Sequence, residues 1–562
     1  MTEYQYVIVG GGSAGCAIAG RLSEDADRSV LLLEEGPRDW YPWIHLPGMM
    51  YKTATGNLLQ RLEFEHPEGR GLVGTPTMVQ ARVLGGGSSV NGMVYIRGIP
   101  EDYDTWAAQG AVGWSYSDVL PYFIRAESND TFAGGVHGWD GPVGVSTPEY
   151  VDPLSKAWLQ ACQQFGMPFN ADFNSGTQKG CGFYQMTARG GRRSSAAVAY
   201  LRPARHRPNL QVKTGHRVLR VLVEGGRAVG VEVARGGQVA TIRATREVIL
   251  CAGAIQTPRL MLLSGMGPPD HLKSVGIPVV HELLGVGQNL SDHMDVYMIY
   301  ELKGRAGYDR YKRWDRKMLA GVEYALFGRG PVSSNIIEAG AFWWGNRDDV
   351  RPDVQFAFLP GSGVEEGVDA IPSGFGCTLN ACQTRPRSRG TVALRSSDPA
   401  KPPRIAPNYL SEPYDLDCMA EAVKSGLEIM QQPAMATHIS RPLSPNRTLA
   451  SKTDYQQYVR ERAQRALHPS GTCRIGADSL AVVDSTLRVH GVDGLRIADA
   501  SVMPSVPSGN TNAPCIMIGE RAADFIRNAM SPPHARQGHS GHAACADDAP
   551  TKSRSRVERQ AS

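Results

Sequence analysis

The hydrophobic pattern is clearest at the start of the chain. Residues 6–9 form a short apolar run rich in β-branched side chains, which predicts a strand, and residues 10–15 form a glycine-rich turn. Apolar positions recur at helical spacing over residues 16–22, and residues 30–33 predict a second buried strand that ends at Glu34. The pattern therefore predicts a strand, a turn, a helix and a strand, the opening of an α/β fold.

Further apolar runs predict more strands and a second region of different texture. Residues 218–223 and 228–233 predict an antiparallel hairpin, and residues 248–250 predict another strand. Between about 300 and 465, aromatic clusters and proline-rich connectors predict a second, substrate-facing domain. Within it, Thr453 is the expected N-cap of a helix that continues through Ala466. After about residue 530 the periodicity ends, which predicts a disordered tail.

The composition is that of a globular protein and excludes several other classes. The 562 residues are 42% hydrophobic and 20% charged, enough for a sizeable core and for roughly three to four domains' worth of mass. This mix excludes a collagen-like, coiled-coil or disordered chain. A net charge of +4 is too small for a chain of this length to indicate a nucleic-acid-binding surface. No apolar stretch is long enough to predict a membrane-spanning helix.

The cysteines and the N-terminus bear on location. The ten cysteines are scattered and none has C-x-x-C spacing, so the sequence predicts neither a metal site nor a disulfide framework. Scattered thiols suit a reducing compartment, and the N-terminus carries no signal-peptide pattern. We therefore expect a soluble cytoplasmic protein. Peripheral contact with the inner membrane stays open, although the tail's basic surplus is too small to argue for an anchor.

The glycine turn is the first candidate site. Gly10, Gly12 and Gly15 form the G-x-G-x-x-G pattern, which lets the backbone approach a pyrophosphate while the next helix directs free N–H groups at that anion. Glu34 follows Gly15 by 19 residues, where an acid accepts hydrogen bonds from an adenosine ribose and repels a 2′-phosphate. The pattern argues against NADP and leaves NAD and FAD open. A purely structural glycine turn is the alternative.

Two later segments carry candidate chemistry. Residues 81–93 combine glycines, two serines and an asparagine, suited to wrapping a large polar cofactor, although an ordinary glycine-rich loop is an equal alternative. Asp499 ends an apolar strand, where it would bond a cofactor hydroxyl or cap the next turn. His468 is the histidine that we nominate as a catalytic base, because imidazole titrates near neutral pH. A structural histidine is the alternative.

Together these segments resemble the glucose–methanol–choline (GMC) family of FAD-dependent alcohol oxidoreductases. The likeness runs from about residue 4 to residue 526 and includes landmarks at residues 137–142, 251–255 and 285–293. Residues 91–98 are most similar to bacterial choline-dehydrogenase-like alcohol dehydrogenases. The resemblance implies a mixed α/β and α+β chain: a Rossmann-like FAD-binding domain with a discontinuous substrate-binding domain built on an antiparallel sheet.

The resemblance also implies how the chain is divided. The FAD-binding domain would comprise residues 1–150, 201–300 and 466–530, and the last part would carry the catalytic pair. The substrate-binding domain would comprise an excursion over residues 151–200 and the segment 301–465. Residues 531–562 would form the tail.

The family's site residues fall on numbered positions of this chain. His468 and Asn512 would form the catalytic pair. The glycine turn with Glu34 would hold the ADP half of FAD, and the backbone of Val218 would lie near the adenine. Residues 85–94 would line the isoalloxazine, and residues 499–500 would lie near the pyrophosphate and ribityl chain. The implied cofactor contacts are Gly10, Gly12, Ser13, Ala14, Gly15, Glu34, Leu84, Gly86, Ser89, Asn91, Gly92, Met93, Val94, Val218, Asp499 and Ala500.

The resemblance implies a mechanism as well. His468 would take the proton of the alcohol hydroxyl, Asn512 would fix its oxygen, and hydride would pass from carbon to flavin N5. Val90 stands where some members attach FAD covalently to a histidine, so non-covalent FAD is expected. Ser470 stands where a valine is associated with oxygen reactivity. This favours a dehydrogenase with an external acceptor such as a quinone, a cytochrome or an artificial dye.

The substrate pocket is less defined. Glu338 matches the acid that faces the ammonium group of choline, and Phe356 and Ala357 lie on a neighbouring predicted strand. Ala357 replaces a histidine of choline-active members, which argues against choline. The apolar and aromatic residues of the second domain favour a non-ionic or aromatic primary alcohol. The alcohol, the natural acceptor and the oligomeric state stay open.

Three alternatives accompany an FAD-dependent dehydrogenase of primary alcohols. The first is an oxidase that passes electrons to O2 and produces H2O2. The second is a redox-neutral member similar to hydroxynitrile lyases. The third is a flavin-binding protein without catalysis, which the presence of both His468 and Asn512 argues against.

Overall fold

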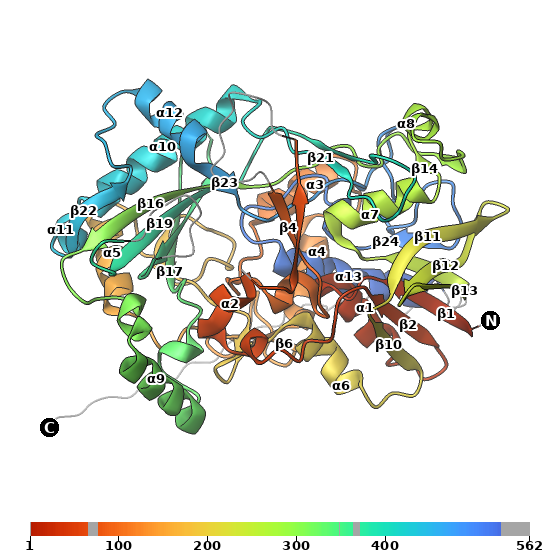
Figure 1. Ribbon diagram of the computed structural model, residues 1–562, viewed down its shortest axis with the longest axis horizontal. Helices are drawn as coiled ribbons and strands as arrows, with labels where there is room; N and C mark the ends of the chain where they lie inside the picture. The colour runs from red at the N-terminus through yellow and green to blue at the C-terminus, as the bar shows by residue number, and fades with distance from the viewer. Residues whose placement is uncertain (1, 55, 66–76, 348, 363–370, 530–562) are drawn as a thin grey trace, which may run out of the picture.

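Two sheets of seven strands each organise the chain. The computed structural model describes residues 2–54, 56–65, 77–347, 349–362 and 371–529, so the tail expected at 531–562 lies outside the described residues. The first sheet lies on the right of Figure 1 and the second on the left. The first takes its strands from residues 2–34, 210–250 and 495–497, and the second takes its strands from residues 180–183, 294–383 and 439–465. Each sheet is therefore assembled from separate stretches of sequence.

The first sheet is mostly parallel. Its strand order is β10-β2-β1-β13-β12-β11, with β24 beside the end of β13, and only the β11–β12–β13 meander is antiparallel. The strands are β1 (Thr2–Val9), β2 (Val30–Glu34), β10 (Leu210–Thr214), β11 (Arg217–Glu224), β12 (Arg227–Arg235), β13 (Gln238–Leu250) and β24 (Leu495–Ile497).

Local patterning accounts for this sheet. The predicted strand, turn, helix and strand are confirmed as β1, α1 (Ser13–Leu22) and β2, and the predicted hairpin is confirmed as β11–β12. All five residues of β2 are buried, as expected for a parallel strand covered on both faces. Helix α1 packs against α13 (Asn512–Asn528), which packs against α4 (Tyr116–Ala126). This packing brings residue 512 to the glycine turn.

The second sheet is antiparallel throughout. Its order is β22-β16-β19-β18-β17-β7, with β23 beside β16. The strands are β7 (Gly180–Phe183), β16 (Met294–Leu302), β17 (Ala339–Trp343), β18 (Val354–Leu359), β19 (Gly376–Gln383), β22 (Ile439–Ser444) and β23 (Ala463–Arg465). Helices α5 (Pro153–Gln164) and α10 (Pro413–Met430) pack on one face of this sheet and bury its aromatic side chains.

The helix expected from Thr453 to Ala466 is wrong at both ends. Helix α12 spans Lys452–Arg462, and its N-cap is Ser451, whose hydroxyl accepts a hydrogen bond from the Asp454 N–H at 3.2 Å. The chain leaves the helix at Ala463 and forms β23 against β16. Tertiary pairing of the backbone therefore overrides the helical pattern of these residues.

Shorter elements connect the two sheets. The helical segments are η1 (Pro42–His45), η2 (Pro47–Met49), α2 (Met50–Ala54), η3 (Gly86–Ser89), α3 (Pro100–Ala108), η4 (Ala197–Leu201), α6 (Arg202–Ala204), α7 (Gly253–Leu263), α8 (Pro269–Ser274), η5 (Tyr308–Lys312), α9 (Trp314–Phe327), η6 (Pro331–Ser333), α11 (Pro433–Ala436) and η7 (Ala500–Val502). The paired short strands are β3 (Leu59–Glu63) with β4 (Thr77–Ala81), β5 (Glu127–Asn129) with β6 (Val143–Val145), β8 (Ala188–Arg189) with β9 (Arg192–Arg193), β14 (Met266–Gly267) with β15 (His281–Glu282) and β20 (Thr391–Ala393) with β21 (Arg404–Ala406). Of the helices described, none has the length and apolar character to cross a membrane.

Candidate active site

Both sheets contribute to the wall of one cavity of about 550 Å³, which we call the central cavity. The sequence-predicted residues that line it are Gly10, Gly12, Ser13, Ala14, Glu34, Gly86, Asn91, Gly92, Met93, Val94, Val218, Ala357, His468, Asp499, Ala500 and Asn512. Five other predicted residues lie behind its wall: Gly15, Leu84, Ser89, Glu338 and Phe356. The cavity thus joins the nucleotide cradle to the predicted catalytic pair.

The glycine turn is shaped by close backbone packing. Gly10 has φ +105°, and a Cβ placed there would lie 2.4 Å from the carbonyl oxygen of Cys251. A Cβ on Gly15 would lie 2.0 Å from the carbonyl oxygen of Gly10. Gly15 therefore does not touch the cavity; it lets helix α1 approach the end of β1.

The start of α1 presents unpaired donors to the cavity. Gly12 is the N-cap and has no side chain with which to cap the first turn, and Ser13 and Ala14 line the cavity beside it. The first N–H groups of a helix have no partner within the helix, and the helix dipole places positive potential there. This end of the cavity is suited to an anionic group such as a pyrophosphate.

Glu34 ends β2 at the same side of the cavity. Its carboxylate accepts hydrogen bonds from the N–H groups of Gly11 at 2.9 Å and Gly36 at 2.8 Å. Burial raises the pKa of Glu34 to about 7, although the two N–H groups act in the opposite direction. The carboxylate keeps acceptor capacity on the cavity side, which matches the predicted contact with ribose hydroxyls.

Replacing Glu34 with Gln should weaken flavin retention. The variant keeps one acceptor oxygen but loses the charge that strengthens a bond to a ribose hydroxyl, so we expect the Kd of the flavin to rise about tenfold. Fluorescence of flavin released on dilution measures this Kd. The exposed Glu3→Gln on β1 is the control, and equal retention by both variants would contradict the assignment of Glu34.

The loop over residues 84–94 has an inner and an outer layer. Gly86 and Asn91 to Val94 line the cavity, whereas the Ser89 hydroxyl is buried and donates to the Leu84 carbonyl at 2.7 Å. Arg193 fixes this loop from behind by donating to the carbonyl of Ser88 and to both oxygens of Asn91. Ser89 and Leu84 therefore fix the conformation of the loop but do not line the cavity.

Asp499 acts on the protein's own backbone. Its carboxylate accepts hydrogen bonds from the Gly253 N–H at 2.8 Å and from the Thr257 hydroxyl at 2.6 Å, at the start of α7. It also accepts from the Ser501 N–H at 2.8 Å, which caps η7. Of the two roles open from the sequence, the capping role is present in the structure, while the side chain still borders the cavity.

His468 is partly buried and lines the other end of the cavity, beside the buried His293 on the segment before β16. The two Nδ1 atoms lie 3.0 Å apart, and Nε2 of His293 lies 3.1 Å from the Thr384 carbonyl oxygen. A carbonyl only accepts, so His293 Nε2 carries a proton and donates it. Burial lowers the pKa of His293 well below 6.5, so this ring is neutral and its Nδ1 accepts from His468 Nδ1–H.

This chain of bonds fixes the tautomer of His468. With its proton on Nδ1, the ring has an unprotonated Nε2. Burial lowers the pKa of His468 to about 4, so the ring is neutral at physiological pH. The backbone N–H of His468 donates to Asp292 at 2.7 Å, and the other oxygen of Asp292 accepts from Tyr409 at 2.6 Å. Asp292 and His293 belong to the landmark at residues 285–293, which therefore positions His468.

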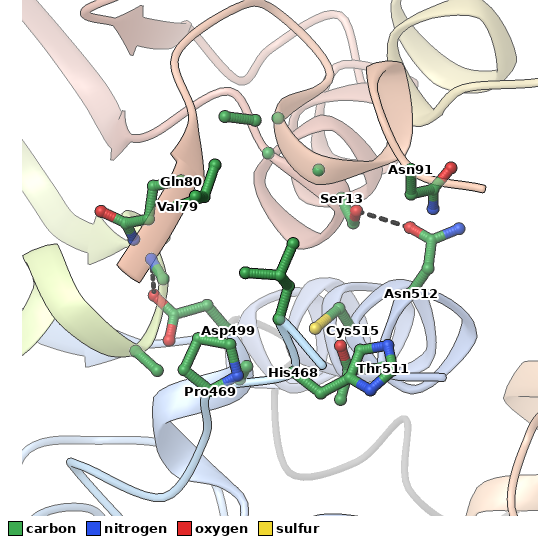
Figure 2. A pocket seen from close by; sticks show the side chains of 18 of the residues that line it. Ser13, Val79, Gln80, Asn91, His468, Pro469, Asp499, Thr511, Asn512 and Cys515 are labelled. Atoms are coloured by element: carbon green, nitrogen blue, oxygen red, sulfur yellow. Dashed lines mark hydrogen bonds between the residues drawn. The ribbon is translucent and has the colours of Figure 1, made fainter. Parts of the chain in front are cut away.

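The amide beside His468 is Asn510 rather than Asn512. Asn510 Nδ2 lies 3.3 Å from His468 Nε2, whereas the Asn512 side-chain oxygen accepts a hydrogen bond from Ser13 at 2.8 Å (Figure 2). Asn512 still projects into the cavity from the start of α13, and its Nδ2 is buried without a partner among the described residues. The predicted pair is thus brought into one cavity, but direct contact with the imidazole belongs to Asn510.

The predicted substrate residues separate by strand parity. On β18, Gln355 and Ala357 face the cavity, while Phe356 points into the core of the second sheet. Glu338 lies in another network, where its carboxylate accepts from the hydroxyls of Ser155 and Tyr308 and from the Asp152 N–H. Contact of Glu338 or Phe356 with a substrate in the cavity is therefore not supported by their positions.

The carboxylate at this end of the cavity is Asp295, which the sequence analysis missed. It stands on β16 two residues after His293, and burial raises its pKa to about 6. Its Oδ1 is buried with no hydrogen-bond partner among the described residues. Tyr297 and Asn380 line the wall beside it, so this end is polar, contrary to the expected apolar pocket. The sequence signal that could have revealed Asp295 is its position two residues after His293, the last residue of the landmark at 285–293.

The residues present fit a flavin dinucleotide. The open start of α1 and the Glu34 carboxylate suit its pyrophosphate and ribose. The Nδ2 group of Asn512, which has no partner among the described residues, offers a donor farther along the cavity. A Cβ on Gly87, which lines the wall, would meet no atom within 4 Å, so the loop leaves room there for a bulky group.

Fold and site together define an oxidoreductase with a nucleotide-binding parallel sheet and a separate substrate-facing sheet. Family models described as GMC oxidoreductase match residues 4–295 and 386–519. The chain belongs to the GMC oxidoreductase family.

Three relatives illustrate the likeness. An "Alcohol dehydrogenase [acceptor]" of Pseudomonas putida is 40% identical, over 93% of this chain and 95% of its own length. A human "Choline dehydrogenase, mitochondrial" is 42% identical, over 93% and 90% of the two chains. Among solved structures, pyridoxine 4-oxidase from Mesorbium loti superposes with a TM-score of 0.83 at 29% identity, over 93% of this chain and 99% of that one. The mixed fold with two sheets is therefore the GMC fold.

Proposed function

We propose that this protein is an FAD-dependent dehydrogenase that oxidises a primary alcohol to an aldehyde and passes the electrons to an external acceptor. The observation that carries the proposal is the central cavity, in which a nucleotide cradle at one end is continuous with a partly buried, neutral imidazole at the other. The relatives described as alcohol and choline dehydrogenases support the reaction class. The division of the chain into cofactor and substrate domains, as expected from the sequence, and a cytoplasmic location are part of this proposal.

We propose that FAD binds without a covalent bond. Val90 stands where a tethering histidine would be needed, and an isopropyl side chain offers no atom for such a bond. The cradle at the start of α1, Glu34 and the loop at residues 84–94 would hold the cofactor along the cavity. Denaturation should therefore release all of the flavin into the supernatant.

His468 is the residue that would accept the proton of the alcohol hydroxyl. Carbon gives up hydride readily only as the hydroxyl loses its proton, because the forming carbonyl draws electron density from oxygen. His468 Nε2 carries no proton, because the hydrogen bond to His293 keeps the ring proton on Nδ1 of His468. It can therefore accept the hydroxyl proton as the C–H bond breaks. When bound, the flavin supplies the acceptor for the hydride.

The two asparagines orient the reacting alcohol. Asn510 Nδ2 lies against the same Nε2 that would take the proton, so it also lies next to the alcohol oxygen. Asn512 has a buried N–H2 without a protein partner, which is suited to donate to that oxygen or to the cofactor. His293 is fully buried and His468 is partly buried at the cavity wall, so a bound cofactor and alcohol would exclude water from the imidazole and strengthen these bonds.

Asp295 indicates the class of alcohol. A buried carboxylate with an open oxygen is costly unless a ligand pairs with it, so the preferred alcohol carries a cationic or hydrogen-bond-donating group away from its hydroxyl. Tyr297 and Gln355 add polar surface beside it. This replaces the non-ionic or aromatic alcohol expected from the sequence.

The pH dependence should separate the two ends of the cavity. Asp295 binds its partner group in the ionised form, and its pKa is about 6, whereas His468 accepts a proton in the neutral form, and its pKa is about 4. Acidification therefore removes binding first and proton acceptance later. We expect kcat/KM to be level above about pH 7, to reach half of its maximum near pH 6 and to fall further below it. In Asp295→Asn the fall should begin only near pH 4 to 5. An unchanged profile in the variant would contradict the assignment.

An anaerobic screen of primary alcohols tests the proposed reaction. Loss of the yellow flavin absorbance on mixing, with appearance of aldehyde, is the expected result. No bleaching but cleavage of a cyanohydrin would support the lyase alternative, and stoichiometric H2O2 in air would support the oxidase. Ser470, buried in the place of the oxygen-associated valine, favours a slow reaction with O2. Quinone or dye acceptors should therefore turn the enzyme over much faster.

A further inference from the structure

Helix α9 (Trp314–Phe327) projects from the lower left of the molecule in Figure 1. All fourteen of its residues are described, and of these only Ala320 is buried. Isolated helices of this length are marginal in water, because most helical stability in proteins comes from packing an apolar face. A helix with so little packing therefore calls for a second covering surface.

The apolar residues of α9 face away from the protein. Ala320 and Tyr324 form the inner side, where the Tyr324 hydroxyl donates to the Gly191 carbonyl at 3.0 Å. Trp314, Met318 and Val322 recur at every fourth position along the outer side. Exposed fractions of the outer side chains are Trp314 74%, Met318 58%, Leu319 62%, Val322 48%, Leu326 68% and Phe327 64%. The amphipathic pattern is thus inverted with respect to the body of the protein.

Cations flank this outer side, which we call the α9 face. Between residues 310 and 330 the chain carries six basic residues and two acidic ones. Three of the basic residues form ion pairs, Arg310 with Asp152, Lys312 with Asp309 and Arg313 with Asp315, while Arg316 and Lys317 are exposed within the helix. Arg316 and Lys317 therefore place positive charge beside the apolar residues.

We propose that the α9 face docks on the surface of a bilayer that contains anionic lipid. An exposed apolar face of this size marks an interaction site. A tryptophan and bulky aliphatic side chains bordered by lysine and arginine are typical of a helix that lies in the headgroup region.

Docking would bring the central cavity close to the bilayer. Helix α9 packs against η6, which packs in turn against η2. Met50 follows η2 directly, Ile337 follows η6 by four residues, and both line the cavity. The inference does not depend on which alcohol is oxidised, and it gives a lipid-soluble electron acceptor a short path to the enzyme.

Vesicle sedimentation with the full-length holoenzyme tests the proposal. Vesicles of phosphatidylcholine alone are compared with vesicles that contain about one third phosphatidylglycerol. We expect the enzyme to pellet with the anionic vesicles and to be released by high salt. The triple variant Trp314→Ser, Leu319→Ser and Leu326→Ser should partition at least about tenfold less, because it removes three of the exposed apolar side chains that would enter the bilayer. Trp139→Ser, which alters an equally exposed tryptophan at 75%, is the matched control.

The controls keep the result interpretable. Turnover with a soluble dye should be the same in the triple variant and the wild type, which shows that the variant is folded. Loss of binding in Trp139→Ser as well, or failure of the wild type to pellet with anionic vesicles, would overturn the proposal. Sedimentation velocity identifies the rival occupant: a wild-type dimer that becomes a monomer in the triple variant, without vesicle binding, would also overturn it.

Discussion

Replacing His468 with Ala should lower kcat/KM for the alcohol by a factor of about 10² to 10⁴, the usual contribution of a positioned base. The flavin should remain bound, because the cradle at the other end of the cavity is untouched. The loss should appear in the rate of flavin bleaching under anaerobic, single-turnover conditions. That measurement isolates the chemical step from reoxidation by the acceptor.

A matched histidine variant guards against general effects. His271 lies outside the central cavity and accepts a hydrogen bond from the Leu394 N–H at 3.0 Å, so His271→Ala removes a histidine without touching the site. It should bleach at the wild-type rate. If His468→Ala also bleached at that rate, His468 would not be the base. His293→Phe should give an intermediate loss, because the tautomer of His468 would no longer be held.

Replacing Asp295 with Asn should abolish the preference for charged alcohols. Choline and its neutral carbon isostere, 3,3-dimethylbutan-1-ol, have the same shape and differ in charge. The wild type should favour the cation in kcat/KM by about ten- to a hundredfold, the value of one charge interaction in a desolvated site. The variant should treat the two alcohols within a few-fold of each other, mainly through a change in KM.

Glu338→Gln is the informative control for Asp295. Glu338 is the acid that family resemblance singles out, but its carboxylate is already held by Ser155, Tyr308 and Ser334. Its variant should lose stability and keep the ratio between the two alcohols. If the preference for choline over its neutral isostere were lost in Glu338→Gln and kept in Asp295→Asn, the substrate contact would have to be assigned to Glu338.

Local sequence signals were sufficient for the nucleotide end of the molecule. The strand, glycine turn and helix are encoded within residues 6–34, because strand burial, tight backbone packing and helix initiation each leave a pattern in adjacent residues. His468 could also be nominated from its residue type, since few side chains serve as a base near neutral pH, and the structure places it at the cavity wall.

The residues at the substrate end of the cavity could not be predicted from local sequence patterns. Whether Phe356 or Ala357 faces the cavity depends on which side of β18 meets the cavity, a difference of one residue in register. The choice between Asn510 and Asn512 depends on how α13 approaches the glycine turn, far away in sequence. The end of α12 at Arg462 likewise reflects pairing with β16 rather than any local stop signal.

The most direct test is a crystal structure of the reduced holoenzyme with its aldehyde product. The account predicts flavin along the glycine turn and the product oxygen within hydrogen-bonding distance of His468 Nε2, about 2.6 to 3.2 Å. A product seated elsewhere, an imidazole turned away from its oxygen, or a cavity that binds no flavin would contradict it.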